Sequence, residues 1–274
     1  MSLAAVAKKE FRDTVRSRSL FVVTGLFLLW AGFLASIQHI PDTYPQSSVP
    51  RSTRALLNSM KQSSAFVALI GLGLGYNAIA GERESGRYKL LLGLPNSRRD
   101  VVYGKFLGRT AVVAVAIAVA HSVTALVALF TYESFAVGPF ALYTFFTFCY
   151  GAVHIAVALA ISVALRSRLR ALAVTALLYG FFWFFWALAL VSIQQLLIGI
   201  RNPDWFILLG MLNPSNAFEY ATVAFVPGVA DLTTLVRPDG PYLHESFGLP
   251  ILLLWLVLPL QLGYRRFKTM DLPT

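Results

Sequence analysis

Residues 171–198 read ALAVTALLYGFFWFFWALALVSIQQLLI, a run of 28 positions without a charged residue. A helix that crosses a bilayer core about 30 Å thick needs roughly 20 apolar residues in succession. Only 13% of the 274 residues are Asp, Glu, Lys or Arg, whereas about 25% is typical of soluble proteins. So few charges cannot cover such apolar segments with a polar surface, and the chain is therefore predicted to be an integral membrane protein.

Five further apolar runs are long enough to span a bilayer. They are continuous, whereas the strands of a membrane barrel would alternate in segments of about ten residues, so we expect helices. Together with Ala171–Ile198, the predicted spans are Leu20–Ile37, Ser63–Ala80, Phe106–Phe130, Pro139–Leu165 and Phe247–Tyr264. The sequence thus predicts an all-α membrane protein in which residues 1–274 form one transmembrane domain with six spans.

Basic residues are unevenly distributed between the segments that connect these spans. Eighteen Lys and Arg lie before the first span, around the second loop, in the fourth loop and in the tail, whereas the other three loops hold five. Because cytoplasmic segments carry the excess of Lys and Arg, both termini and the second loop are predicted to be cytoplasmic, in the plasma membrane. The same distribution accounts for the net charge of +10 without a nucleic-acid-binding surface.

Three stretches outside the spans, one before the first span and two in the fifth loop, are also predicted to be helical. In residues 2–18, Leu3, Ala7, Phe11 and Val15 recur on one side opposite several basic residues, although Glu10 falls near the apolar side. This pattern predicts a helix at the membrane surface, and a simple basic flank of the first span is the alternative. In the long fifth loop, residues 205–209 and 217–225 are apolar but too short to span, and we expect short external helices there.

The second loop, GERESGRYKLLLGLPNSRRD (residues 81–100), is charged at both ends and apolar in the middle. Tyr88, Leu91 and Leu92 have a helical spacing, and Pro95 ends that short helix. An apolar edge on a short charged loop requires something to bury it. The membrane surface, the rest of this chain and a cytoplasmic partner are the three candidates.

A search for catalytic or metal-binding patterns finds none. The single cysteine, Cys149, excludes a multi-cysteine metal site, and no metalloprotease or nucleophile-elbow motif is present. His121 and His154 lie within spans, where each could make a helix–helix hydrogen bond or line a substrate pathway.

Small and aromatic residues within the spans indicate close helix contacts. Gly71 and Gly75 have a spacing that permits close packing, either within the subunit or across a dimer. Phe182, Trp183 and Trp186 belong to an aromatic run that surrounds the fifth span. These rings could anchor the span in lipid, form a subunit interface or line an apolar substrate path.

The order of several short motifs resembles that of a permease subunit of the ABC-2 type. The motifs are Lys9-Glu10-Phe11, Glu82-Arg83-Glu84, Leu90-Leu91-Leu92, Pro95-x-Ser97-Arg98, Gly104-Lys105 and Leu212-Asn213-Pro214. The family typically has Thr where this chain has Arg87. The six spans, the cytoplasmic termini and the long loop before the last span agree with the resemblance over essentially the whole chain.

The resemblance implies a non-catalytic membrane subunit that exports its substrate as a homodimer or a heterodimer with a second permease. A separate ABC ATPase subunit would bind ATP and magnesium, and this chain would hold no cofactor. By analogy, residues 82–95 form the coupling helix that docks on the ATPase. The docking residues expected from the family pattern are Glu82, Arg83, Glu84, Arg87, Tyr88, Leu91, Leu92 and Pro95.

Two functions of other classes are alternatives. An ion-coupled secondary transporter would be expected to have carboxylates within its spans, but all thirteen acidic residues lie outside the predicted spans or at their edges. An intramembrane enzyme or assembly factor independent of ATP would, if catalytic, need a nucleophile–base pair or a metal site. The sequence does not indicate the transported substrate.

Overall fold

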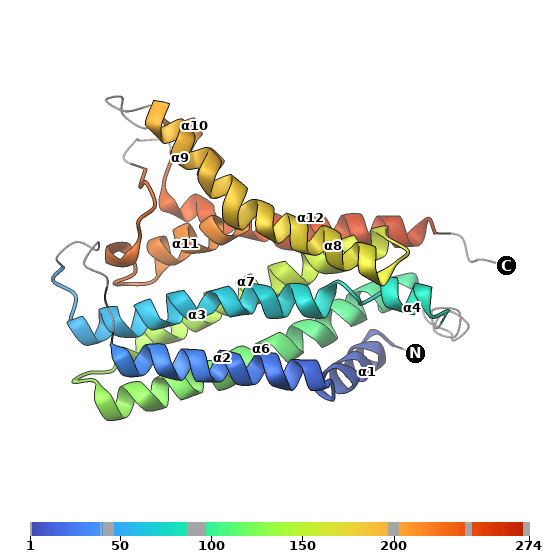
Figure 1. Ribbon diagram of the computed structural model, residues 1–274, viewed down its shortest axis with the longest axis horizontal. Coiled ribbons are helices and arrows are strands. Elements are labelled where there is room, and N and C mark those ends of the chain that lie inside the picture. Colours follow the sequence, from blue (N-terminus) through green and yellow to red (C-terminus); the bar gives the residue numbers. More distant parts are fainter. Residues whose placement is uncertain are drawn as a thin grey trace.

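The structure, a computed structural model, describes residues 2–38, 40, 47–86, 97–196, 203–238 and 243–270 (Figure 1). These residues form helices and turns, without a strand among them. Six of the helices, counted within the described ranges, are long and apolar enough to cross a membrane. The predictions of an all-α membrane protein and of six spans are confirmed.

The elements follow one another along the chain in a simple order. The first four spans and the helices beside them are α1 (Leu3–Val15), α2 (Arg18–Ile37), α3 (Arg51–Gly75), α4 (Ala80–Glu84), α6 (Arg98–Thr131) and α7 (Val137–Ala164). The fifth span consists of α8 (Arg168–Gly180), the π-helix η1 (Phe181–Phe185) and α9 (Trp186–Leu196). After it come α10 (Asp204–Met211), α11 (Pro214–Phe225), η2 (Ala230–Leu232), η3 (Glu245–Phe247) and α12 (Gly248–Lys268). The two short helices predicted before the last span are thus present as α10 and α11.

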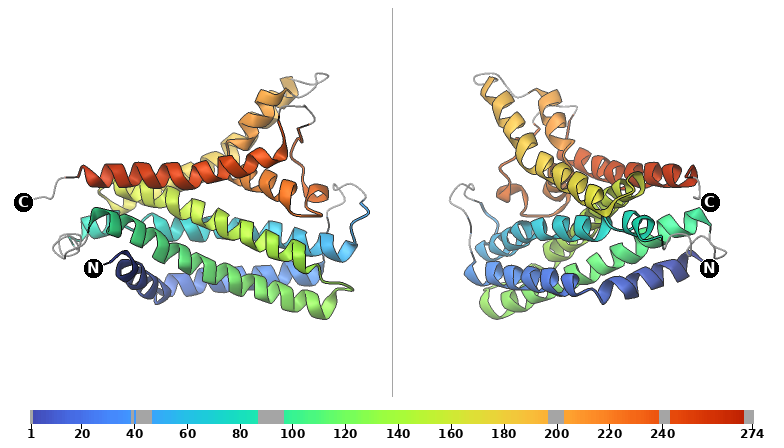
Figure 2. Two further views of the ribbon diagram at one scale, coloured as in Figure 1. Left: turned by 180° about the vertical axis from the view of Figure 1, so that it is seen from behind. Right: turned by 45° about the vertical axis from the view of Figure 1, so that its right-hand side comes forward.

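Both chain termini lie at the same end of the bundle as α4, which we call the termini end (Figures 1 and 2). At the opposite end, which we call the distal end, α2 ends and α3 begins, and α6 ends and α7 begins. Helix α7 packs against α3, α6, α11 and α12, and this gives it a central place. The fifth span differs from the others, because its α9 half diverges from the bundle beside α10 in all three views.

Helix α3 begins twelve residues before the predicted start of the second span at Ser63. Residues 51–62 contain Arg, Ser, Asn and Lys side chains, which lower their hydropathy and hide the helix from a search for apolar runs. The structure buries the apolar side of this extension, with Leu56, Leu57 and Met60 fully inaccessible. Lys61 Nζ lies 2.6 Å from Glu219 Oε1 of α11. This ion pair joins the extension to residues 204–236, which include α10 and α11 and which we call the distal segment.

Helix α1 packs against α6, so it is not held by the membrane surface alone. Val6 and Glu10 are its buried residues. Two glycines of α6 make the contact close, because a Cβ at Gly104 would lie 2.7 Å from Val6 Cβ and one at Gly108 would lie 2.7 Å from Glu10 Cβ. Glu10 therefore lies near the apolar side of α1 because that side packs against α6.

Gly71 and Gly75 lie inside the subunit, where α3 crosses α7. A Cβ at Gly71 would approach His154 Cβ to 2.8 Å, and a Cβ at Gly75 would approach Ala158 Cβ to 2.4 Å. Both positions are buried within the chain. Of the two alternatives given by their spacing, these contacts show packing within the subunit, because α7 of the same chain lies against both glycines.

We predict that Gly75→Val destabilises the fold, whereas Gly73→Val does not. A side chain at Gly75 must displace Ala158, and overpacking of this kind costs about 1–3 kcal/mol. Gly73 lies on the same helix and is the matched control, because a Cβ at this position would meet no atom within 4 Å. Thermal unfolding of the purified variants in detergent measures the difference, and equal melting temperatures would contradict the described packing of α3 on α7.

Candidate functional site

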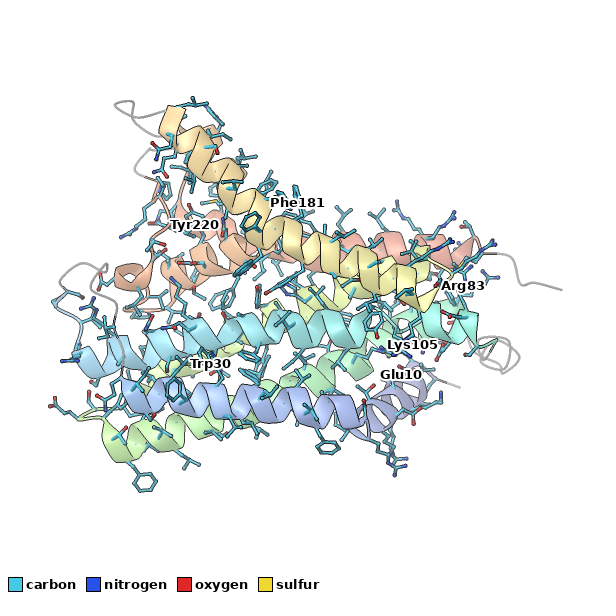
Figure 3. All side chains as sticks on the ribbon, viewed as in Figure 1. Glu10, Trp30, Arg83, Lys105, Phe181 and Tyr220 are labelled. Atoms are coloured by element: carbon cyan, nitrogen blue, oxygen red, sulfur yellow. The ribbon has the colours of Figure 1, made fainter. Side chains whose placement is uncertain are left out.

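The termini end of the bundle contains a cluster of interacting charged side chains, which we call the anchor cluster: Glu10, Glu82, Lys105 and Arg109. Glu10 and Lys105 are buried and are labelled in Figure 3, whereas Glu82 and Arg109 are partly exposed. Lys105 has no exposed surface and lies at its centre. Its Nζ donates to Glu10 Oε1 of α1 and to Glu82 Oε1 of α4, both at 2.6 Å. Arg109, one turn further along α6, donates from Nε to Glu10 Oε2 at 3.1 Å. One lysine thus joins α1, α4 and α6.

The electrostatics of the anchor cluster favour the ionised form of Glu10. Burial alone raises the pKa of the Glu10 carboxyl, but the positive charges and hydrogen bonds of Lys105 and Arg109 outweigh it, so the pKa lies below the usual 4.5. A buried ion pair is maintained only where other charges and hydrogen bonds offset its loss of water. Two carboxylates and two cations provide this balance here.

Three arginines at this end bind the carbonyl groups at the C-termini of three spans. Arg83 donates from Nη1 to the carbonyls of Val163 and Leu165, at the end of α7. Arg98 binds the carbonyl of Phe267 at 2.7 Å, near the end of α12.

Arg109 completes the set by donating to the carbonyl of Leu74, near the end of α3. The last carbonyls of a helix have no partner within the helix and carry a partial negative charge, so a guanidinium stabilises them. The segment from Arg83 to Arg109, which includes the second loop, therefore caps every span that ends at the termini end.

Helix α4 is held by each of its neighbours. The backbone N–H groups of Ile79 and Ala80 donate to Ser162 Oγ of α7, both at 3.0 Å. Glu84 accepts a hydrogen bond from the N–H of Arg168 at the start of α8, where a negative charge is favoured by the helix dipole. The five residues of α4 thus contact α6, α7 and α8 directly.

The predicted docking residues divide into two groups. Glu82, Arg83 and Glu84 contact other parts of this chain, and Glu84 is also exposed. The remaining predicted docking residues lie outside the described residues: Arg87, Tyr88, Leu91, Leu92 and Pro95. Their docking role stays a prediction from the sequence.

The two histidines of the spans lie in different surroundings. His121 is buried in α6, where its Nδ1 lies 2.8 Å from Thr144 Oγ1 and its ring packs near Phe140. His154 is buried in α7, where its Nδ1 lies 2.9 Å from the carbonyl oxygen of Tyr150. His154 lines a hollow beside the fifth span.

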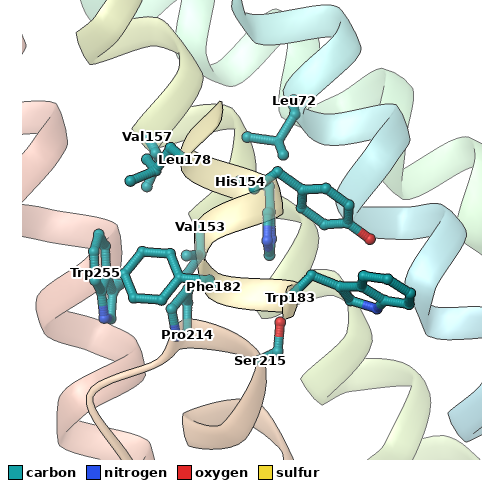
Figure 4. A pocket seen from close by; sticks show the side chains of 11 residues that line it. Leu72, Val153, His154, Val157, Leu178, Phe182, Trp183, Pro214, Ser215 and Trp255 are labelled. Carbon is teal, nitrogen blue, oxygen red and sulfur yellow. The ribbon is translucent and has the colours of Figure 1, made fainter. Parts of the chain in front are cut away.

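The predicted aromatic residues lie together along the face of the fifth span that turns toward α11. Phe182 and Trp183 line the hollow at His154, and together with Trp186 they line a larger cavity next to it (Figure 4). The π-helix η1 lies in this wall, and such turns within spans are frequent at functional sites. Lipid anchoring alone does not describe these rings, because they also border an internal space.

Asn213 explains why an Asn-Pro pair precedes α11. Its Oδ1 accepts a hydrogen bond from the N–H of Ser215 and so caps the helix. Its Nδ2 donates to the carbonyl of Phe182 at 2.8 Å, which fixes the π-helix against α11. This side chain therefore joins the fifth span to α11, in addition to the apolar packing of Leu190 and Ile193.

The anchor cluster itself is not predicted from the sequence. Glu10 and Lys105 belong to two separate motifs, and their positions differ by 95 residues. The Gly104-x-x-x-Gly108 spacing on α6 was the available signal, because two small residues one turn apart often admit a neighbouring helix. A charged residue on the apolar side of a helix was the second signal.

Comparisons with known proteins agree with this architecture. Residues 4–272 match the family described as ABC-2 family transporter protein. A Pseudomonas aeruginosa protein described as "Probable ABC transporter permease protein NosY" is 30% identical over an alignment of 274 positions, and the alignment covers 96% of each chain. A Stutzerimonas stutzeri protein of the same description is 27% identical over an alignment of 268 positions, and the alignment covers 94% of this chain and 92% of the relative.

We predict that Glu10→Gln destabilises the protein at neutral pH by about 3–5 kcal/mol, because one partner of a buried ion pair is lost. Asp13→Asn is the matched control, since the Lys9–Asp13 pair on the same helix is exposed and such pairs contribute about 0–1 kcal/mol. The pKa of Glu10 is lowered in the folded state, so its contribution is complete above pH 4.5 and is lost as the pH falls through that lowered pKa. Denaturant unfolding between pH 7 and pH 3 should show the Glu10→Gln deficit shrink in acid. An equal loss of unfolding free energy with Glu10→Gln and Asp13→Asn at pH 7 would contradict the predicted role of Glu10.

Proposed function

The chain belongs to the ABC-2 family of transporter proteins, and from this premise we propose that it is a permease subunit that couples a separate ATPase subunit to export across the plasma membrane. Both relatives are described as probable ABC transporter permeases, which supports the permease assignment. Export is favoured by the family resemblance. ATP and magnesium bind to the ATPase subunit in this proposal.

The observation that carries the proposal is the attachment of α4 to the ends of the spans. Helix α4 opens the second loop, and Glu82, Arg83 and Glu84 bind α6, the end of α7 and the start of α8. An ATPase subunit that displaces this loop would therefore move three spans at once.

Buried contacts make this transmission stiff. Separating Lys105 from Glu82 would remove one of the two carboxylate partners of an ammonium group that has no exposed surface, and such a loss is expensive. Helices and packed interfaces switch between discrete arrangements and do not deform gradually. The loop and the span ends are therefore expected to move together.

The docking surface in this proposal is the apolar edge of the second loop, which Tyr88, Leu91 and Leu92 form in the sequence. The charge distribution predicts that the termini end faces the cytoplasm, where an ATPase subunit would reach this edge. A second permease chain would complete the membrane part, as a homodimer or a heterodimer. The exposed face of the fifth span, where Leu177 is 72% exposed, offers an apolar surface for it.

A secondary transporter independent of ATP is the competing function. Transport by such a protein would not require the second loop to bind a partner. Substrate uptake into inverted vesicles, compared with and without ATP, separates the two functions. Transport driven by an ion gradient alone would favour the competing function.

We predict that Leu91→Asp weakens binding of the ATPase subunit by well over tenfold. Burial of a leucine side chain contributes about 1.5–3 kcal/mol, and a carboxylate in its place would lose its water without a partner. Ser85→Asp is the matched control, because it adds the same charge at an exposed position of the same loop. Co-purification of the ATPase, normalised to the permease in the membrane, measures the effect.

A second control addresses insertion into the membrane. Leu20→Asp places a carboxylate in the first span, so the amount of inserted protein should fall, whereas Leu91→Asp should leave it unchanged. Full recovery of the ATPase with Leu91→Asp would show that the second loop is not the docking site.

A further inference from the structure

A cavity of about 350 Å³ lies between the fifth span and the two short helices of the distal segment. Its walls come from η1 and α9 on one side and from α10, α11 and residues 234–236 on the other. The fifth-span side presents aromatic and aliphatic groups, among them Trp183, Trp186 and Leu190. A volume of this size is typical of sites for small organic molecules.

Several polar side chains that line this cavity are bound to the backbone, whereas the indole N–H of Trp186 is buried in the wall without a hydrogen-bond partner in the described part of the chain. Asn216 donates from Nδ2 to the carbonyl of Gly210 at 3.0 Å, and Tyr220 donates from its hydroxyl to the carbonyl of Val236 at 2.6 Å. Asn213 is bound to Phe182 and Ser215. No Asp, Glu, Lys or Arg is among the described residues that form the walls. The cavity therefore suits an uncharged, apolar molecule.

A second, deeper hollow of about 30 Å³ adjoins the cavity on the side of α7. The two spaces share Phe182, Trp183 and Ser215 as lining residues, so these three side chains form the partition between them. The deeper hollow has room for about one water-sized group. Figure 4 shows His154 projecting from α7 into this region, between Leu72 and Ser215.

The hydrogen bond of His154 determines which of its nitrogens a ligand can meet. Its Nδ1 faces the carbonyl oxygen of Tyr150, which can only accept, so Nδ1 carries the proton. In the neutral ring Nε2 then has the free lone pair. That nitrogen has no hydrogen-bond partner within the described part of the chain, although the residue is only 5% exposed. The hollow thus contains the unpaired Nε2 of His154 in walls that are otherwise apolar except for the hydroxyl-bearing residues Tyr179 and Ser215.

We propose that the cavity and the hollow together form a binding site for an uncharged amphiphile, with an apolar body in the cavity and a single hydroxyl-type donor at His154 Nε2. The inference deepens the proposed transport function, because it names a ligand class for the permease. The ligand reaches the site from the bilayer, since the fifth span is exposed beside the opening and Trp183 is 70% exposed.

The test uses the full chain in phosphatidylcholine nanodiscs without an ATPase subunit, and a hexadecanol that carries a photoreactive diazirine. Labelled peptides should map to residues 182–191 and 206–220. Unlabelled hexadecanol should compete for labelling about three- to tenfold better than its methyl ether, which lacks the donor, because one hydrogen bond to a neutral group has that effect. Palmitate, which is charged, should compete more weakly than hexadecanol.

Variants assign the effect to the two parts of the site. Gly210→Leu should abolish labelling by filling the cavity, because a Cβ at Gly210 would meet only Leu190 Cδ1, at 3.8 Å. Gly25→Leu is the matched control on the first span, where a Cβ would meet no atom within 4 Å. His154→Phe should remove the preference for the alcohol over the ether, and His154→Gln, which keeps an acceptor, should restore part of it.

Labelling spread evenly over lipid-facing residues and unchanged by Gly210→Leu would overturn the site. Equal competition by the alcohol and the ether in the unmodified chain would overturn the role of His154, and preferential competition by palmitate would overturn the uncharged class. Because no ATPase is present, these results are independent of ATP-driven transport. A failure of the proposed coupling would leave the labelling intact, and a failure of the labelling would leave the coupling intact.

Discussion

The burial of one ammonium group constrains the whole termini end of the molecule. Lys105 has no exposed surface, and the loss of its hydration must be offset by partners at close range. Glu10 and Glu82 provide these partners at 2.6 Å, and they come from two separate helices that precede α6 in the sequence. The N-terminal helix and the start of the second loop therefore cannot move independently of α6 without exposing a charge.

The same end of the bundle combines this constraint with helix capping. Arg83, Arg98 and Arg109 bind the last carbonyls of α7, α12 and α3, so the second-loop region holds the ends of three spans that are far apart in the sequence. At the distal end, the fifth span is joined to the rest of the chain by the hydrogen bond from Asn213 to Phe182 and by apolar packing of Leu190 and Ile193. Ion pairs and bonds to carbonyl groups thus connect the termini end, whereas a hydrogen bond and apolar contacts connect the fifth span to the distal end.

Much of this architecture follows from local sequence properties. Hydropathy predicted the six spans, because burial in lipid requires about 20 apolar residues regardless of the neighbours. Hydropathy failed at the start of α3, because residues 53–60, several of them polar, are buried within the protein. It also could not pair Glu10 with Lys105, since such a contact depends on how two helices cross. The partner of Gly75 and the hollow at His154 depend on tertiary packing for the same reason.

The central claim is that the anchor cluster and Arg83 transmit movement of the second loop to the spans. The most direct measurement is the distance between spin labels at Leu196, near the end of α9, in the two permease chains of the complex with the ATPase subunit, with and without ATP. The labels require a Cys149→Ser background, because Cys149 is the only cysteine of the chain. In the Glu82→Gln, Arg83→Gln double variant, the account predicts that the ATPase still binds but that the ATP-dependent change in distance is lost. An undiminished change in distance in that variant would contradict the account.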